Sequence, residues 1–322
     1  MRLFYASGHP VLGYEEVALF SEMGITVYAK SVVDDTEHPE DCLRPDLASP
    51  DDEAVLESCE TVVVSSADWL FKNWERLKKK RVVWRTFGQS TRFVEEKLKP
   101  LRDQGLLIVR ASPREMTIDG NLGADAFIRC YKDPDLFQGW SGEREQIINF
   151  TRHMKYRARH CNFVFLKKVV QDLPFRLFGP QNDNLGEVWA SGLLDFNELL
   201  GELRANRAYF HTGVYPAGYT LSFVEAWMTG IPVVALDRGR GNDPELLGHE
   251  LYEIPDLIAH GQTGFYSDDE TELRQIFRDL LHDTAYASAI SQKGREAAIQ
   301  IFGKETVRRT WREFWQNDVR TV

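Results

Sequence analysis

The sequence predicts an α/β fold built as two successive parallel sheets, and three observations support this. Short apolar runs with the length of buried strands alternate along the chain with segments of helical period. A stretch rich in Pro, Gly and acidic residues, 131–143, interrupts the alternation and predicts an interdomain linker, and a second series of the same kind follows it. A chain of 322 residues is also long enough for two domains that each bury their own core.

The first series begins with a strand at 2–6, and a helix at 15–23 follows it before Gly24. The next segment, 34–52, is acidic and contains Pro, which predicts an irregular, solvated connection. Apolar runs predict four more strands, and the segments between them predict two more helices. We place these strands at 26–29, 61–64, 81–84 and 106–109, and these helices at 68–80 and 93–104.

The second series repeats this alternation after the interruption. Its helices are predicted at 162–171, 197–205, 221–228, 270–281 and 305–315. Its strands are predicted at 146–150, 175–179, 209–210 and 233–236, with a short strand reached through the turn 260–265. The two series predict domains at 1–142 and 143–304, with 305–322 as a separate C-terminal element.

The composition limits the classes of partner and compartment. The formal net charge of −10 argues against a general nucleic-acid binder, which normally carries a basic excess. The four Cys, at 42, 59, 130 and 161, have no CxxC or metal-like spacing, which predicts free thiols in a reducing compartment. No apolar run approaches the length that spans a bilayer, and the N-terminus lacks the pattern of a signal peptide. We therefore expect a cytoplasmic protein.

The stretch 209–236 contains the strongest chemical signal in the sequence. It predicts a strand, a Gly-bearing loop, a short helix, a Gly-Pro turn and a second buried strand. The helix begins near Thr220, where its free amide groups and the positive end of its dipole suit an anion. Glu225 is the one charge in this otherwise apolar helix, where an ionised carboxylate is costly unless it is paired. The stretch therefore predicts an anion site with a carboxylate about a turn and a half away.

The same stretch resembles the retaining, glycogen-synthase-like glycosyltransferases of family 4, which have the GT-B fold. That family carries roughly E-G-F-G-L-x-x-x-E-A-x-x-x-G-x-P-V-V, and Gly218, Leu221, Glu225, Gly230 and Pro232 match it. Ala217 stands in place of the first Glu. Shorter fragments extend the resemblance at 192–199, 260–265 and 302–305, and weaker ones lie at 13–16, 105–112 and 123–127. The resemblance implies two Rossmann-like domains facing a cleft, with the C-terminal helix crossing back onto the first domain.

The resemblance also implies which residues bind a nucleotide-sugar donor, and it implies no cofactor and no metal. Negative charge develops on the leaving diphosphate, so such a site needs fixed cations or aimed amide groups. Arg152 matches the family's Arg, Arg157 stands at its Lys position, and Lys155 is a substitute candidate. Glu225 matches the residue that binds the ribose hydroxyls. The backbone amides expected at the donor are those of Gly218, Tyr219, Thr220 and Leu221.

Two further groups of residues are candidates on weaker grounds. His9 and Glu15 follow the first strand, where α/β proteins place ligands, and they are candidates for the acceptor or donor-sugar side. Gly13 would let the loop backbone approach the donor phosphates. Loop and helix-cap roles are the alternative for these residues.

The basic run Arg76–Arg81 predicts either weak contact with a membrane surface or a solvated helix end. His211 is expected to end a strand, and the sequence leaves open whether its side chain packs in the core or contacts the donor.

We therefore expect a hexosyltransferase-type glycosyltransferase that moves a sugar from a UDP- or GDP-sugar to the hydroxyl of a carbohydrate or another acceptor. Ala217 opens three alternatives: a donor sugar bound differently, a course other than retention, or lost activity. We favour the first, because the phosphate and ribose positions are kept. The rival hypotheses are a non-catalytic nucleotide-sugar-binding or partner-binding protein on the same scaffold, and a sugar-nucleotide epimerase. A dinucleotide oxidoreductase is disfavoured, because no G-x-G-x-x-G follows a strand.

Overall fold

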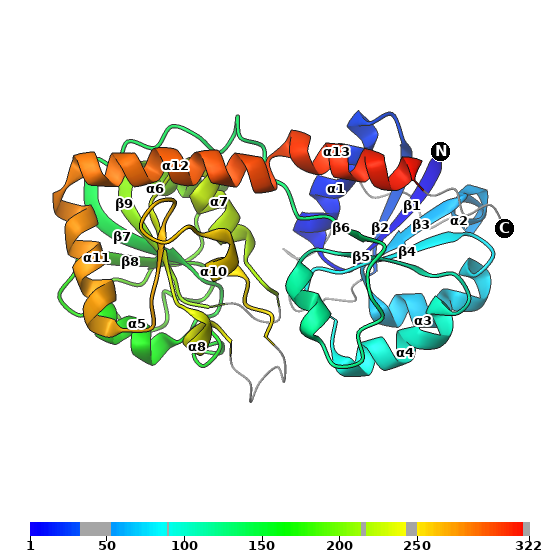
Figure 1. The fold of residues 1–322 in the computed structure, drawn as a ribbon, viewed down its shortest axis with the longest axis horizontal. Helices are drawn as coiled ribbons and strands as arrows, with labels where there is room; N and C mark the ends of the chain where they lie inside the picture. The colour runs from blue at the N-terminus through cyan, green and yellow to red at the C-terminus, as the bar shows by residue number, and fades with distance from the viewer. Residues whose placement is uncertain (33–52, 89, 214–216, 243–249, 318–322) are drawn as a thin grey trace. The chain divides into compact units, whose positions relative to one another are not determined.

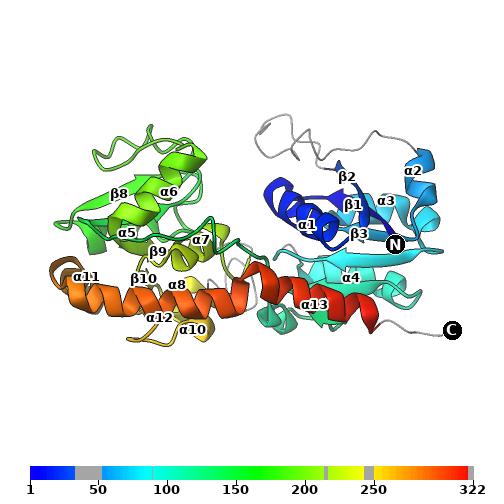
Figure 2. The ribbon, with the colours of Figure 1, turned by 90° about the horizontal axis from the view of Figure 1, so that it is seen from above.

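The computed structural model describes residues 1–32, 53–88, 90–213, 217–242 and 250–317. The chain forms two compact units, Met1–Cys130 with Arg308–Val322, and Tyr131–Val307. Each unit contains one parallel sheet with helices on both of its faces (Figure 1, Figure 2). The irregular connection that the sequence predicts at 34–52 lies outside the described residues.

The first unit is built on a six-stranded sheet. Its elements are β1 (Arg2–Ser7), α1 (Pro10–Glu22), β2 (Thr26–Ser31), α2 (Glu53–Ser58), β3 (Thr61–Val64), α3 (Ala67–Leu77), β4 (Arg81–Arg85), α4 (Arg92–Arg102), β5 (Leu107–Arg110), a 3₁₀ helix (Pro113–Thr117), β6 (Ala126–Phe127) and α13 (Lys304–Gln316), whose last residues belong to this unit. The strand order is β2-β1-β3-β4-β5-β6.

Helices bury both faces of this sheet, which is why its central strands are continuous apolar runs. α3 and α4 cover one face, where Trp74 and Leu98 join a core with Val62 and Trp84. α1 and α13 lie on the other face (Figure 1). There Trp311 of α13 stands edge-on to a ring of α1, Phe20, at 4.9 Å between centroids.

The second unit is built on a five-stranded sheet. Its elements are β7 (Arg144–Phe150), α5 (Phe163–Val170), β8 (Phe175–Phe178), α6 (Phe196–Ala205), β9 (Asn206–His211), α7 (Leu221–Thr229), β10 (Val233–Ala235), α8 (Arg238–Gly241), α10 (Ile254–Leu257), β11 (Phe265–Tyr266), α11 (Glu270–His282) and α12 (Thr284–Phe302). The strand order is β11-β10-β9-β7-β8.

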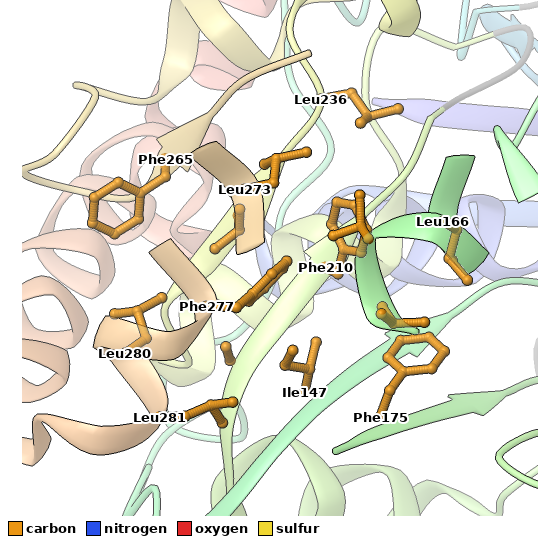
Figure 3. Close-up of a cluster of buried hydrophobic side chains, with 14 of the residues drawn as sticks. Ile147, Leu166, Phe175, Phe210, Leu236, Phe265, Leu273, Phe277, Leu280 and Leu281 are labelled. Atoms are coloured by element: carbon orange, nitrogen blue, oxygen red, sulfur yellow. The ribbon is translucent and has the colours of Figure 1, made fainter. Parts of the chain in front are cut away.

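The main core of the second unit lies between this sheet and the pair α5 and α11. Figure 3 shows Phe210 of β9 facing Phe277 of α11, with ring centroids 5.1 Å apart, and Leu166 of α5 nearby. α6, α7 and α12 cover the opposite face (Figure 1). α7 is largely buried on this side, and its N-terminus lies at the carboxyl end of β7.

The strand order of each sheet locates one favoured ligand position. In both units the second strand in chain order lies on one side of the first, and all later strands lie on the other side. Ligands of such sheets bind at the carboxyl ends of the two strands where the order reverses. In the second unit these strands are β7 and β9, which end at Phe150 and His211.

Most elements agree with the sequence-based expectation, but α1 begins earlier than expected, and α2, α8, α10 and α12 were not predicted. α1 begins at Pro10 rather than at residue 15, because His9 caps it. α12, a helix of 19 residues, was not predicted. Near its middle lies Gly294, where a Cβ atom would lie 2.8 Å from the carbonyl oxygen of Thr263 and 2.9 Å from Nε1 of Trp227. The Gly therefore allows α12 to pack closely against its neighbours.

The interrupting segment after residue 130 packs into the second unit. Lys132 donates its backbone amide to the carbonyl oxygen of Phe302 at 3.0 Å. Trp140 donates its indole N–H to the carbonyl oxygen of Asn206 at 2.7 Å. This segment, which composition alone marks as a linker, is therefore attached to the sheet and to the end of α12.

Candidate functional site

The carboxyl end of β7 meets the first turn of α7. Ser222 of that turn donates its hydroxyl to the carbonyl oxygen of Phe150 at 3.4 Å, and Tyr209 donates its own hydroxyl to Ser222 at 3.1 Å. Thr220 caps the helix, since its Oγ1 accepts from the amide of Phe223 at 3.1 Å. The positive end of the α7 dipole is thus fixed beside the strand end that Arg152 follows.

The loop before α7 is anchored from both sides. Gly218 accepts a backbone hydrogen bond from Glu253 at 2.9 Å. The ring of Tyr219 is buried and stands edge-on to Phe302, with centroids 5.0 Å apart. The side chain of Tyr219 therefore belongs to the core, and its backbone amide is the part that remains a candidate for ligand contact, together with those of Gly218, Thr220 and Leu221.

Glu225 lies on the second turn of α7 and is paired. Its Oε1 is 2.7 Å from Nζ of Lys132, and the two side chains are 16% and 3% exposed. The Lys132 ammonium also lies 5.6 Å from the centroid of the Phe137 ring. The sequence predicts that this carboxylate needs a partner, and the structure supplies it from the segment after residue 130. The side chain of Glu225 nevertheless keeps more exposure than that of Lys132.

The predicted phosphate-binding cations lie on the turns 151–162, between β7 and α5. Arg152 is half-buried and Lys155 is exposed. Arg157 is half-buried, with its amide bonded to the carbonyl oxygen of His153 and its carbonyl to the amide of Cys161. The structure thus places all three cations after the same strand end. The chain reverses sharply here, because His153 and Asn162 both adopt φ of 49°.

His211 ends β9 and is a core residue, which decides between the two roles that the sequence leaves open. It is 2% exposed, and its ring stacks on Tyr252 and meets Phe223 edge-on. Its Nε2 lies 3.3 Å from Oγ1 of Thr220, the cap of α7. Burial lowers the pKa of His211 to about 3, so the imidazole is neutral at pH 7. His211 therefore supports the helix cap without contributing charge to the site.

We expect His211 to make the second unit sensitive to acid. An unfolded His accepts a proton near pH 6.5, whereas the folded one does so only near pH 3, so stability is complete above pH 6.5 and falls as the pH decreases below it. Between pH 7.5 and pH 5 this loss is about 2 kcal/mol. In His211→Gln, the change over the same interval should be smaller by that amount. Hydrogen exchange at the β7 and β9 amides, corrected for intrinsic rates, measures it, and equal acid sensitivity in both proteins would contradict a neutral His211.

Two of the first-unit candidates, His9 and Gly13, have structural roles. His9 is the N-cap of α1, with Nδ1 3.5 Å from the amide nitrogen of Leu12. Gly13 lies inside α1 rather than in a loop, so the expected approach of loop backbone to phosphates is wrong for this residue. A Cβ atom there would lie 2.1 Å from Oγ of Ser7, so its lack of a side chain allows α1 to pack on β1. Glu15 is half-buried in the same helix.

A buried polar cluster beside these residues was not predicted. Glu16 of α1 accepts from the Tyr5 hydroxyl at 2.7 Å and from Nε of Arg85 at 2.8 Å. The guanidinium of Arg85 also lies 4.6 Å from the Phe87 ring centroid and 5.5 Å from one ring of Trp311. These partners come from four separate segments, so no local motif in the sequence indicates them.

The basic run Arg76–Arg81 is largely engaged within the first unit. Arg76 pairs with Glu53 and Glu57 at 3.2 and 3.3 Å, and Lys78 pairs with Glu75 at 2.6 Å. Lys80 donates to the carbonyl oxygens of Glu57 and Cys59, and the Arg81 guanidinium lies over the Trp315 ring. These contacts favour a structural role, and membrane-surface contact stays a prediction. Among the described residues, no helix combines the length and apolar character needed to cross a bilayer.

No known family model and no curated protein matches the sequence. Solved structures do match. A glycosyltransferase of Rickettsia africae has a TM-score of 0.70 at 13% identity, covering 100% of this chain and 99% of that one. Sucrose-phosphate synthase of Thermosynechococcus elongatus has a TM-score of 0.69 at 13% identity, covering 98% of each chain. The HepE protein of Anabaena, solved with UDP-glucose, has a TM-score of 0.65 at 14% identity, covering 98% of this chain and 99% of that one. The likeness shows the fold, GT-B, with two parallel-sheet α/β domains.

Proposed function

We propose that this protein is a glycosyltransferase that binds a UDP- or GDP-sugar on its second unit and transfers the sugar to an acceptor hydroxyl. The observation that supports it most directly is the contact between Ser222 and Phe150. It puts the N-terminus of α7 beside the strand end that leads into the cation-bearing turns. A diphosphate at that point would meet a helix dipole and guanidinium groups together.

Each predicted residue has a distinct task in this proposal. Arg152 and Arg157 stabilise the charge that develops on the leaving diphosphate, with Lys155 as an additional cation. The amides of Gly218, Tyr219, Thr220 and Leu221 orient the phosphates. Glu225 accepts hydrogen bonds from the ribose hydroxyls through the part of its carboxylate that Lys132 does not cover. Catalysis then comes from positioning and charge stabilisation, without a metal ion or a cofactor.

The family 4 assignment is part of this proposal, and Ala217 modifies it. Ala cannot accept a hydrogen bond from the donor sugar or support positive charge at the anomeric carbon. We therefore propose that the donor sugar is held in a different way from the family pattern, while the nucleotide is held in the usual way. The stereochemistry of the product then becomes a separate measurement, made by NMR of the new glycosidic bond.

We expect UDP or GDP to raise the melting temperature of the protein, because a ligand that binds only the folded state stabilises it. Arg152→Met should weaken this binding by about tenfold, since one charge-assisted hydrogen bond is lost. EDTA should leave the binding unchanged. Arg176→Met is a matched control, because Arg176 is exposed on β8 and bonds to Ser191 at 2.9 Å. Calorimetry that detects no diphosphate binding by the wild type would contradict the proposal.

The pairing of Glu225 with Lys132 and the loss of the Glu at position 217 together favour one alternative, a non-catalytic nucleotide-sugar-binding protein. In that case the donor binds, but neither sugar transfer nor donor hydrolysis occurs. Slow hydrolysis of a bound UDP-sugar by the wild type, abolished in Arg152→Met, would exclude this alternative. An assay of the products formed from the donor alone distinguishes a sugar-nucleotide epimerase from both the glycosyltransferase and the non-catalytic binding protein.

A further inference from the structure

The segment 151–168 concentrates positive charge on an acidic protein. It contains six Lys or Arg residues and two His, and no Asp or Glu, in a chain of net charge −10. The proposed function uses Arg152, Lys155 and Arg157. It leaves Arg159 and Lys168 without a task, although both follow on the same segment.

A pocket of about 250 Å³ lies beside the first turns of α5 and is lined by those two residues. Arg159 comes from the turn before the helix, Lys168 comes from the helix itself, and a third cation, Arg240, comes from α8. Among the described residues that line the pocket, none is acidic. Three cations, two from the segment 151–168 and one from α8, therefore line one pocket.

The wall that carries Arg240 is fixed independently of its charge. The Arg240 guanidinium lies over the ring of Phe165, 3.8 Å from its centroid. The backbone amide of Arg240 donates to the Asp268 carboxylate at 3.0 Å. Its backbone carbonyl accepts from Nδ2 of Asn162 at 3.1 Å. The other carboxylate oxygen of Asp268 accepts from the backbone amide of Asp237 at 3.0 Å. Both oxygens of this carboxylate therefore bind backbone amides.

We infer that this pocket is a phosphate subsite formed by Arg159, Lys168 and Arg240. A tetrahedral anion of high charge suits a pocket lined by three cations better than a carboxylate does, and guanidinium groups can bind it in a bidentate manner. The volume accommodates a phosphoryl group with a few further heavy atoms, because it is slightly smaller than a typical drug-sized pocket. The phosphoryl group belongs either to the donor nucleotide or to a separate phosphorylated small molecule.

The pocket borders the proposed donor site. Asn162, which lines it, also donates to the carbonyl oxygen of Thr212 at 3.0 Å, directly after β9. A phosphoryl group of the donor could therefore reach it, and so could a phosphate on a second substrate. Only the assignment of the subsite to a phosphate of the donor nucleotide rests on the proposed function.

The test is a calorimetric titration of the full chain with inorganic phosphate. Lys168→Met and Arg240→Met should each weaken phosphate binding by about tenfold, the loss expected for one charge-assisted hydrogen bond. Met keeps the length of the aliphatic stem, and the backbone bonds of Arg240 do not depend on its side chain. Lys167→Met is the matched control, because Lys167 precedes Lys168 on α5, pairs with Glu187 at 3.1 Å and does not line the pocket. It should change the affinity less than twofold.

Equal losses in Lys167→Met and Lys168→Met would overturn the inference, because they would show an effect of net charge alone. So would unchanged binding in both pocket variants, or no phosphate binding by the wild type. Repeating the titration with saturating UDP distinguishes the two sources. Competition assigns the subsite to the nucleotide's own phosphate, and independent binding assigns it to a separate phosphorylated ligand. If UDP does not bind, the proposed function fails while the phosphate result stands by itself.

Discussion

Replacing Arg110 with Met should lower the free energy of unfolding of the first unit by about 3–5 kcal/mol. The Arg110 guanidinium donates from both terminal nitrogens to the Glu95 carboxylate, at 2.9 Å each, and neither side chain is exposed. Removing the guanidinium would leave a buried carboxylate without its counter-charge, which costs more than the two lost hydrogen bonds. Hydrogen exchange at the amides of β3 and β4 measures the effect, because it reports the opening of this unit alone.

The double variant with Met at both positions is the control. It should recover most of the loss, because replacing a whole buried ion pair with apolar residues is close to neutral. About 1 kcal/mol should remain lost, since the amide of Leu122 donates to Glu95 at 2.9 Å and would lose its acceptor. Burial raises the pKa of Glu115, whose carboxylate lies 3.7 Å from the Arg110 guanidinium. No recovery in the double variant would contradict the assigned role of the pair.

The sequence predicted the sheets well because their strands are buried on both faces. Such strands are short, continuous apolar runs, and β3 is an example in which all four residues are buried. α12 was not predicted because its own sequence carries no comparable local pattern. It is rich in Ala and contains Gly294, and it is stable because it packs against α7, a contact with no local signature.

In the candidate site, too, residues of one sequence motif were predicted, whereas their partners from distant segments were not. The spacing of Thr220 and Glu225 lies within one motif, so the sequence placed the helix cap and the carboxylate correctly relative to one another. The partner of the carboxylate, Lys132, comes from a segment that composition marks only as a linker. The role of His211 depends on Tyr252, whose ring stacks on it from a different part of the chain. Neither pairing could be deduced from periodicity or spacing.

We expect Glu225→Gln to weaken the binding of UDP by roughly tenfold to a hundredfold, because a hydrogen bond to an ionised acceptor contributes about 1.5–3 kcal/mol. The variant should bind 2′,3′-dideoxy-UDP as the wild type does, since that nucleotide lacks the ribose hydroxyls which the carboxylate is proposed to accept. The Gln side chain keeps the shape of Glu and can still bond to Lys132. Calorimetric titration of the wild type and of Glu225→Gln, each with UDP and with 2′,3′-dideoxy-UDP, measures the four affinities that test this prediction.

The two nucleotides separate a ligand role of Glu225 from a purely structural one. If the carboxylate served only to hold α7 through Lys132, Glu225→Gln would weaken both nucleotides equally, because the amide groups at the helix N-terminus would be displaced for either ligand. Glu202→Gln is the control, since Glu202 pairs with Arg144 at 2.8 Å on the surface of the same unit and should leave both affinities unchanged. Lys132→Met should lower the stability of the second unit, because it leaves the largely buried Glu225 unpaired. A loss confined to the nucleotide with ribose hydroxyls therefore assigns Glu225 to the donor, and an equal loss assigns it to the fold.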